Sequence, residues 1–316
     1  MNNMEENTGM ALWKTFLDNT MKRDMHTVDI IIGVSLPIIF VVSLIVNTVT
    51  CIVILSDKTM HTITNYYLLN LAVSDLIATF GIPVELYYHF FSWRTYNRSS
   101  SIECKLHYFF VGILWNNSTL TMTALAIERY IAVWHPLAVT SKPIWKRMLK
   151  IMTVLWAVAV VEALSEIANV DLVTTENLNT CFTIPTDRAR IVNGILALLT
   201  FILPTVVMTA VHLMIVSKVN SSKNRSRDVA FNYPNNRRKV NKLIVAITLS
   251  FLVCWIPFFS IRVLVFTMDL EQLMKLEEYW GILSNATIVN SWISTAINPI
   301  LFSLMSTKFR EALKVR

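Results

Sequence analysis

The sequence predicts an all-α membrane protein in which seven helices cross a bilayer as one bundle, and three observations lead to this fold class. Of the 316 residues, 54% are hydrophobic. Only 16% are charged, against about 25% in an average soluble domain. Seven apolar stretches have the roughly 20 residues that a helix needs to cross a bilayer, and none alternates like a membrane β-strand. The composition therefore excludes a soluble globule and a disordered chain.

The seven predicted spans follow one another through short links, so no separate soluble domain is expected. They cover residues 30–55, 66–90, 106–134, 151–170, 191–216, 240–268 and 279–304. Residues 1–29 precede the bundle, residues 30–304 form it, and residues 305–316 follow it. The first 27 residues lack the basic start and short apolar core of a cleavable signal peptide. The first span is therefore expected to act as an uncleaved signal anchor.

The positions of the basic residues predict the orientation of the bundle. If the N-terminus lies outside, the inner side carries 18 of the 28 Lys and Arg residues with four acids, a net charge of +14. The outer side then carries 10 basic residues with 16 acids, a net charge of −6. Inner loops of membrane proteins are enriched in Lys and Arg. We therefore expect an extracellular N-terminus and a cytoplasmic C-terminus.

Asp75 lies in the middle of the second span. A carboxylate inside a membrane is costly, so it must face the bundle interior and find polar partners there. The candidate partners from other spans are Asn47, Ser118, Ser294, Thr295 and Asn298. This cluster is either a site for a monovalent cation or water, or a polar network that only fixes helix packing. No cofactor is predicted other than an allosteric Na+ bound by Asp75, Ser118, Ser294 and Asn298.

Two cysteines and one asparagine on the outer side are expected to be modified. Cys104 lies just before the third span and Cys181 lies between spans four and five. Both face an oxidising compartment, so we expect a disulfide that holds this loop over the bundle. Asn97 lies in an outer loop and matches the acceptor pattern for N-glycosylation.

The third span ends with Glu128, Arg129 and Tyr130 at the inner face. Adjacent opposite charges at a helix end are either an ordinary pair at the membrane surface or a switch in which Arg129 changes partners. The residues alone leave both interpretations open.

Taken together, landmarks on all seven spans resemble the rhodopsin-like class of G-protein-coupled receptors. They are Asn47, residues 71–75, Cys104, residues 128–130, Trp156, Pro204, Phe251, residues 254–257 and residues 298–302. The resemblance implies coupling to a heterotrimeric G protein and no enzymatic activity. It also implies a short amphipathic eighth helix that begins near Phe309. Its implied activation switch consists of Glu128, Arg129, Tyr130, Trp255, Pro257, Asn298, Pro299 and Phe302.

The sequence departs from the family pattern at several positions. Val46 replaces a usual glycine, while His212 and Phe302 replace two usual tyrosines whose hydroxyls support the active arrangement. Arg237 stands where some members carry an acid that holds Arg129. We therefore expect Glu128 to be the main restraint on Arg129.

The outer side predicts the class of ligand. Its net negative charge favours a cationic ligand, and its candidate anions are Glu85, Glu103, Glu162, Glu166 and Asp171. Val111 replaces the aspartate of amine receptors, and the seventh span lacks the lysine of opsins. We expect ligand contacts with Glu85, Trp115, Phe258, Phe259, Arg262 and Trp292, and we expect Trp255 to sense occupancy. Arg262 either accepts a ligand carboxylate or carbonyl, or pairs with Glu85 until ligand arrives.

Residues 60–68 and the Gly-x-Pro-x-Glu motif at residues 81–85 resemble the neuromedin U, pyrokinin and CAPA neuropeptide receptors. The resemblance implies a short amidated peptide with a near-terminal arginine, for which Glu85 is a natural partner, and coupling to Gq. It also implies a plasma-membrane receptor whose basic inner loops face anionic lipid. The alternatives are a receptor of the same class for another peptide or small ligand, and a membrane transporter or channel. Seven spans exclude a soluble nucleic-acid-binding protein.

Overall fold

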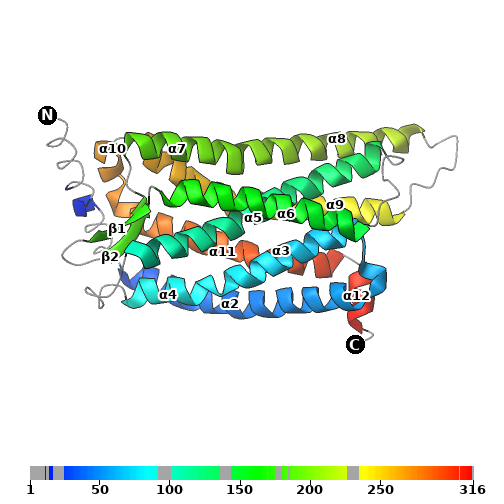
Figure 1. Ribbon diagram of the computed structural model, residues 1–316, viewed down its shortest axis with the longest axis horizontal. Helices are drawn as coiled ribbons and strands as arrows, with labels where there is room; N and C mark the ends of the chain where they lie inside the picture. Colours follow the sequence, from blue (N-terminus) through cyan, green and yellow to red (C-terminus); the bar gives the residue numbers. More distant parts are fainter. Residues whose placement is uncertain are drawn as a thin grey trace.

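The structure is a computed structural model that describes residues 11, 14–16, 25–91, 101–135, 144–168, 170–174, 179–183, 186–225, 235–268, 270–305 and 307–314. Its long helices run lengthwise in one elongated bundle (Figure 1). The helical segments that form the bundle are α2 (Met25–Ser56), α3 (Ile63–Thr79), α4 (Gly81–Phe91), α5 (Ser101–Trp134), α6 (Ile144–Ile167), α7 (Asp187–Ala197), η3 (Leu198–Ile202), α8 (Leu203–Arg225), α9 (Asn235–Thr267) and α11 (Glu277–Met305). Shorter elements are η1 (Lys58–Met60) and α10 (Leu270–Met274).

The predicted bundle is confirmed, but two of its spans are interrupted and several begin or end at other residues than predicted. The second is two helices, because Pro83 offers no N–H to the carbonyl of Thr79, where α3 ends. The fifth is also interrupted, by the single π-helical turn η3 just before Pro204. The fourth starts earlier than predicted, at Ile144, and ends at Ile167, while Val170 begins a strand.

The surface of the bundle is apolar and part of its interior is polar, as expected of a protein in lipid. Ile38, Leu213 and Val253 are 58%, 66% and 69% exposed, whereas Asn47 and Asn117 are fully buried. Among the described residues, six helical segments are long and apolar enough to cross a membrane. The seventh span, α11, has 29 residues but contains several polar side chains.

Asparagines from neighbouring helices satisfy the carbonyls that two prolines leave free. Pro257 in α9 offers no N–H to the carbonyl of Val253, and Asn290 of α11 donates to this oxygen at 3.1 Å and to that of Cys254 at 2.9 Å. In the same way Asn47 of α2 donates to the carbonyl of Thr295, four residues before Pro299, at 2.9 Å. Both proline sites are therefore tied to a second helix.

The two ends of the bundle carry different small elements. At one end, β1 (Val170–Thr174) and β2 (Asn179–Thr183) form an antiparallel hairpin in which Leu172 faces Cys181. At the other end lies α12 (Thr307–Lys314) (Figure 1). Its Phe309 is buried against Phe302, with ring centroids 4.7 Å apart. This helix agrees with the predicted eighth helix.

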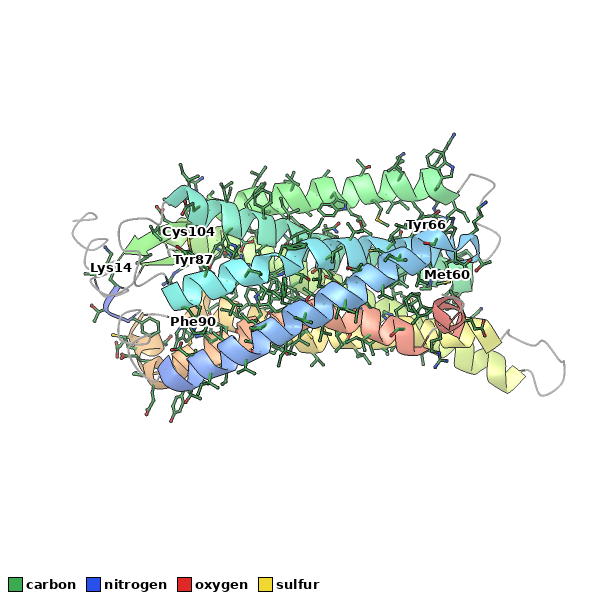
Figure 2. All side chains as sticks on the ribbon, turned by 90° about the horizontal axis from the view of Figure 1, so that it is seen from below. Lys14, Met60, Tyr66, Tyr87, Phe90 and Cys104 are labelled. Atoms are coloured by element: carbon green, nitrogen blue, oxygen red, sulfur yellow. A yellow bond between two sulfur atoms is a disulfide. The ribbon has the colours of Figure 1, made fainter. Side chains whose placement is uncertain are left out.

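Figure 2 places marker residues at the same two ends. Tyr87, Phe90 and Cys104 lie at the hairpin end, and Met60 and Tyr66 lie at the α12 end. The chain thus brings the start of α5 and the end of α4 together beside the hairpin.

Candidate ligand-binding site

A cavity of about 210 Å³ lies between the helices near the hairpin. Side chains from α4, α5, α6, α9, α11 and the hairpin line it. All six residues predicted to contact ligand are among them: Glu85, Trp115, Phe258, Phe259, Arg262 and Trp292. The cavity also includes Trp255, which was predicted to sense occupancy. The structure therefore brings together the complete set of predicted ligand contacts.

A cluster of aromatic rings surrounds Trp115 of α5. Its ring centroid lies 4.8 Å from that of Trp255, 5.3 Å from that of Phe258 and 5.8 Å from that of Trp292, all edge-to-face. Pairs of this geometry contribute about 0.5–1.5 kcal/mol beyond the burial of their surface. A ligand that moves Trp115 must therefore disturb rings on α9 and α11 as well.

Gly81 explains how Trp292 fits against the start of α4. A Cβ atom added to Gly81 would lie 3.1 Å from the edge of the Trp292 ring. The missing side chain thus allows the helix backbone to approach the indole closely.

The charged groups of the cavity do not pair as predicted. Glu85 lies 3.4 Å from Nε2 of His107, and Arg262 pairs with Glu166 of α6, with 2.8 Å between Nη1 and Oε1. Arg262 also donates to Asn193 of α7. Of the two alternatives for Arg262, the pairing with Glu85 is therefore not the one found, because Glu166 holds its guanidinium instead.

Of the five candidate anions on this side, only Glu85 and Glu166 line the described cavity. Asp171 instead accepts a hydrogen bond from Ser101 at 2.5 Å and lies 3.9 Å from Lys105. The hydrogen bond from Ser101 lowers the pKa of Asp171 below its usual value. Asp171 thus holds the hairpin to the start of α5.

The predicted disulfide between Cys104 and Cys181 is confirmed, with Cα atoms 5.6 Å apart. Tyr108 adds a second tie, because its hydroxyl donates to the carbonyl of Cys181 at 3.2 Å. The hairpin is thereby fixed against the cavity, which Cys181 and Leu172 both line. Asn97, the predicted glycosylation site, lies outside the described residues.

All four residues of the predicted sodium cluster are buried in the bundle. Asp75 is 3% exposed, and Asn298 donates to its Oδ2 at 3.2 Å. Ser118 and Ser294 are buried as well, but the hydroxyl of Ser294 donates to the carbonyl of Ser291 in its own helix. The carboxylate and the amide are thus in contact, and the Ser294 oxygen, which donates only its hydrogen, keeps its lone pairs for a cation.

At the opposite end of the bundle, the predicted pairing of Glu128 with Arg129 is wrong. Glu128 pairs with Arg147 of α6 at 2.6 Å, and Arg129 donates to the hydroxyl of Thr64 on α3. Tyr130 stacks on Trp134, with centroids 5.9 Å apart. Residues adjacent in a helix point about 100° apart, which gives Glu128 and Arg129 different neighbouring helices.

Several of these groups were not predicted from the sequence. His107, Asn193, Asn290 and Arg147 carry no motif of their own. The two prolines were the available signal for Asn290 and Asn47, since each proline must free a carbonyl that some neighbour has to satisfy.

The chain is similar to known receptors over most of its length. Residues 46–302 match the family described as 7 transmembrane receptor (rhodopsin family). The chain is 30% identical to human neuromedin-U receptor 1 in an alignment that covers 87% of this chain and 70% of that protein. It is 29% identical to the pig growth hormone secretagogue receptor type 1 (87% and 77% covered) and 26% identical to the Drosophila melanogaster pyrokinin-1 receptor (92% and 80% covered).

Proposed function

Because the chain belongs to the rhodopsin family of seven-transmembrane receptors, we propose that it binds an extracellular peptide and activates a heterotrimeric G protein. The observation that carries this proposal is the cavity that contains all six predicted ligand contacts. Receptors named for neuromedin U and pyrokinin are among its relatives. The proposed ligand is a short amidated neuropeptide of the neuromedin U, pyrokinin or CAPA type, and the proposed transducer is Gq. As a member of this receptor family, the protein is not an enzyme.

In this proposal, Glu85 binds a cationic group of the peptide. Its side chain is 30% exposed and faces the cavity beside His107. A guanidinium can take both carboxylate oxygens in two parallel hydrogen bonds. The aromatic cluster around Trp115 then receives the apolar part of the ligand, and Arg262 contacts a ligand carbonyl.

The signal passes from the aromatic cluster to the far end of the bundle through α9. Trp255 lies against Trp115, two residues before Pro257, where the helix lacks one internal hydrogen bond. Movement at this point swings the rest of α9 outward, Arg129 leaves Thr64, and Tyr130, Asn298, Pro299 and Phe302 rearrange around it. Ligand and G protein both prefer the open form, so each strengthens the binding of the other.

The proposal places the receptor in the plasma membrane, with the hairpin end outside and α12 against the anionic inner leaflet. The excess of basic residues on the α12 side supports this orientation. Asn97 then carries a glycan on the outside. The contact between Asp75 and Asn298 supports binding of Na+ as an allosteric ion, since a buried carboxylate is a natural ligand for a cation.

The proposed function is tested in cells that express the full chain. Amidated neuromedin U and pyrokinin peptides should release intracellular calcium through Gq. Silence across the peptides, together with solute flux in the absence of ligand, would instead favour a transporter.

Glu85→Gln tests the proposed contact itself. It should weaken an arginine-containing peptide by about 10- to 100-fold and leave an analogue with neutral citrulline in place of arginine nearly unchanged. Glu162→Gln is the matched control, because Glu162 does not line the described cavity. An equal loss of affinity for both peptides would show that Glu85 does not bind the positive charge of the ligand.

A further inference from the structure

The guanidinium of Arg262 is held by acceptors from two other helices. Glu166 of α6 takes Nη1 at 2.8 Å, and the side chains of Arg262 and Glu166 are 15% and 16% exposed. Asn193 of α7 takes Nη2. Asn193 is 1% exposed and its own amide N–H donates to the carbonyl of Ala189 at 2.9 Å. That bond fixes the orientation of the amide, so its oxygen stays toward Arg262.

A glycine on α5 lies beside Glu166 in the wall of the cavity. A Cβ atom added to Gly112 would lie 3.7 Å from Oε2 of Glu166 and 3.5 Å from Cβ of Ala163. Gly112 and Glu166 both line the cavity. Both distances are ordinary van der Waals contacts, so only a side chain longer than that of alanine at position 112 would crowd the carboxylate that α6 presents to the ligand space.

These contacts decide which ligand groups Arg262 accepts. An arginine in a pocket ordinarily attracts carboxylates, but here its charge is already balanced by Glu166. A ligand carboxylate at Arg262 would lie close to the Glu166 carboxylate, and like charges in a poorly hydrated site repel strongly. A carboxamide brings an acceptor oxygen without a charge, so it can share Arg262 with Glu166.

We propose that Glu166 is a specificity-determining residue, which restricts Arg262 to uncharged acceptors and so makes the receptor prefer a peptide with a terminal carboxamide over the same peptide with a free carboxylate. This inference rests on the proposed function, because it assumes that the peptide end lies at Arg262. In this proposal, the choice between a terminal carboxamide and a terminal carboxylate is made by Glu166, which lies on α6 and lines the cavity beside Gly112.

The experiment compares two forms of one neuromedin U peptide, which differ only in a C-terminal carboxamide or carboxylate. In the wild-type receptor the amide should be the more potent form in the calcium assay. In Glu166→Gln the ratio of the amide potency to the carboxylate potency should fall by about tenfold or more. The carboxylate peptide should become more potent because it no longer meets a like charge, while the neutral glutamine still accepts a hydrogen bond from Arg262. Glu162→Gln, one turn away on the same helix and outside the cavity, should keep the wild-type ratio. An unchanged ratio in Glu166→Gln, or an equal fall in both variants, would overturn the proposal.

A second measurement separates this inference from the identity of the peptide. Purified full-length receptor is heated with millimolar Nα-acetylargininamide or Nα-acetylarginine, and its unfolding temperature is recorded. The amide alone should stabilise the wild type, and both compounds should stabilise Glu166→Gln. Stabilisation of the wild type by the acid as strongly as by the amide would overturn the role of Glu166. If both neuromedin U and pyrokinin peptides fail to activate the wild type, the proposed ligand class is wrong. The unfolding temperatures with the two arginine compounds still test the role of Glu166 in that case.

Discussion

Replacing Arg147 with glutamine should destabilise the receptor and change its basal signalling, because Glu128 would lose its partner. The carboxylate of Glu128 is 6% exposed and lies 2.6 Å from Arg147. Two unit charges about 4 Å apart attract by about 4 kcal/mol at an effective dielectric constant of about 20. Arg147 is 31% exposed, so solvent screens part of this attraction, and Arg129 can move to replace it. We therefore expect a loss of about 1–2 kcal/mol in the free energy of unfolding.

The assay is thermal unfolding of the purified receptor, in which this loss should appear as a fall of about 2–6 °C. Basal G-protein activation should also decrease, since a freed Glu128 can pair with Arg129 and so add a second restraint to its hydrogen bond with Thr64. Lys150→Gln is the matched control, because Lys150 is an exposed cation on the same helix. It should change neither quantity.

A double-mutant comparison isolates the ion pair. In a Glu128→Gln background, Arg147→Gln should cost little further stability, since the interaction is already lost. If Arg147→Gln costs as much in that background as in the wild type, Arg147 does not act through Glu128 and the reasoning is refuted.

The other expectations concern the disulfide, the buried carboxylate and the proline sites. Cys104→Ser and Cys181→Ser should each reduce peptide binding at the cell surface to the same extent, and the double variant should be no worse; a further loss would indicate separate roles. Asp75→Asn should abolish the dependence of agonist affinity on sodium, and an unchanged dependence would leave Asp75 a packing role only. Asn290→Ala should lower stability by about 1–3 kcal/mol, because the Val253 carbonyl loses its donor. Asn285→Ala should cost less, since Asn285 donates only to Gly281 in its own helix; equal costs would contradict this account.

The sequence predicted the helices well because hydropathy depends on the chain alone. A span must be long and apolar wherever its neighbours lie, so all seven spans could be placed within about five residues of the helix ends, apart from the early start of α6 at Ile144 and the late end of α8 at Arg225. Residues of the cavity lining could also be predicted, since Trp115 and Phe258 lie in the hairpin-side halves of their helices and Trp292 lies at the middle of α11.

The partners of the charged residues could not be predicted in this way. Which carboxylate reaches Arg262 depends on the rotation of α6, which places Glu166 beside it. Which cation reaches Glu128 depends on how α6 packs beside α5. Both are properties of tertiary packing, which the hydropathy of the chain does not predict.

The asparagines at the proline sites have a consequence for sequence change. Replacing Pro257 with alanine would return a backbone N–H to the carbonyl of Val253, and Asn290 would still donate to the carbonyl of Cys254. Replacing Asn290 alone would leave the carbonyl of Val253 without a donor. The loss of Asn290 is therefore most costly while Pro257 is present, so the two residues should change together during evolution. Pro299 and Asn47 form a second such pair.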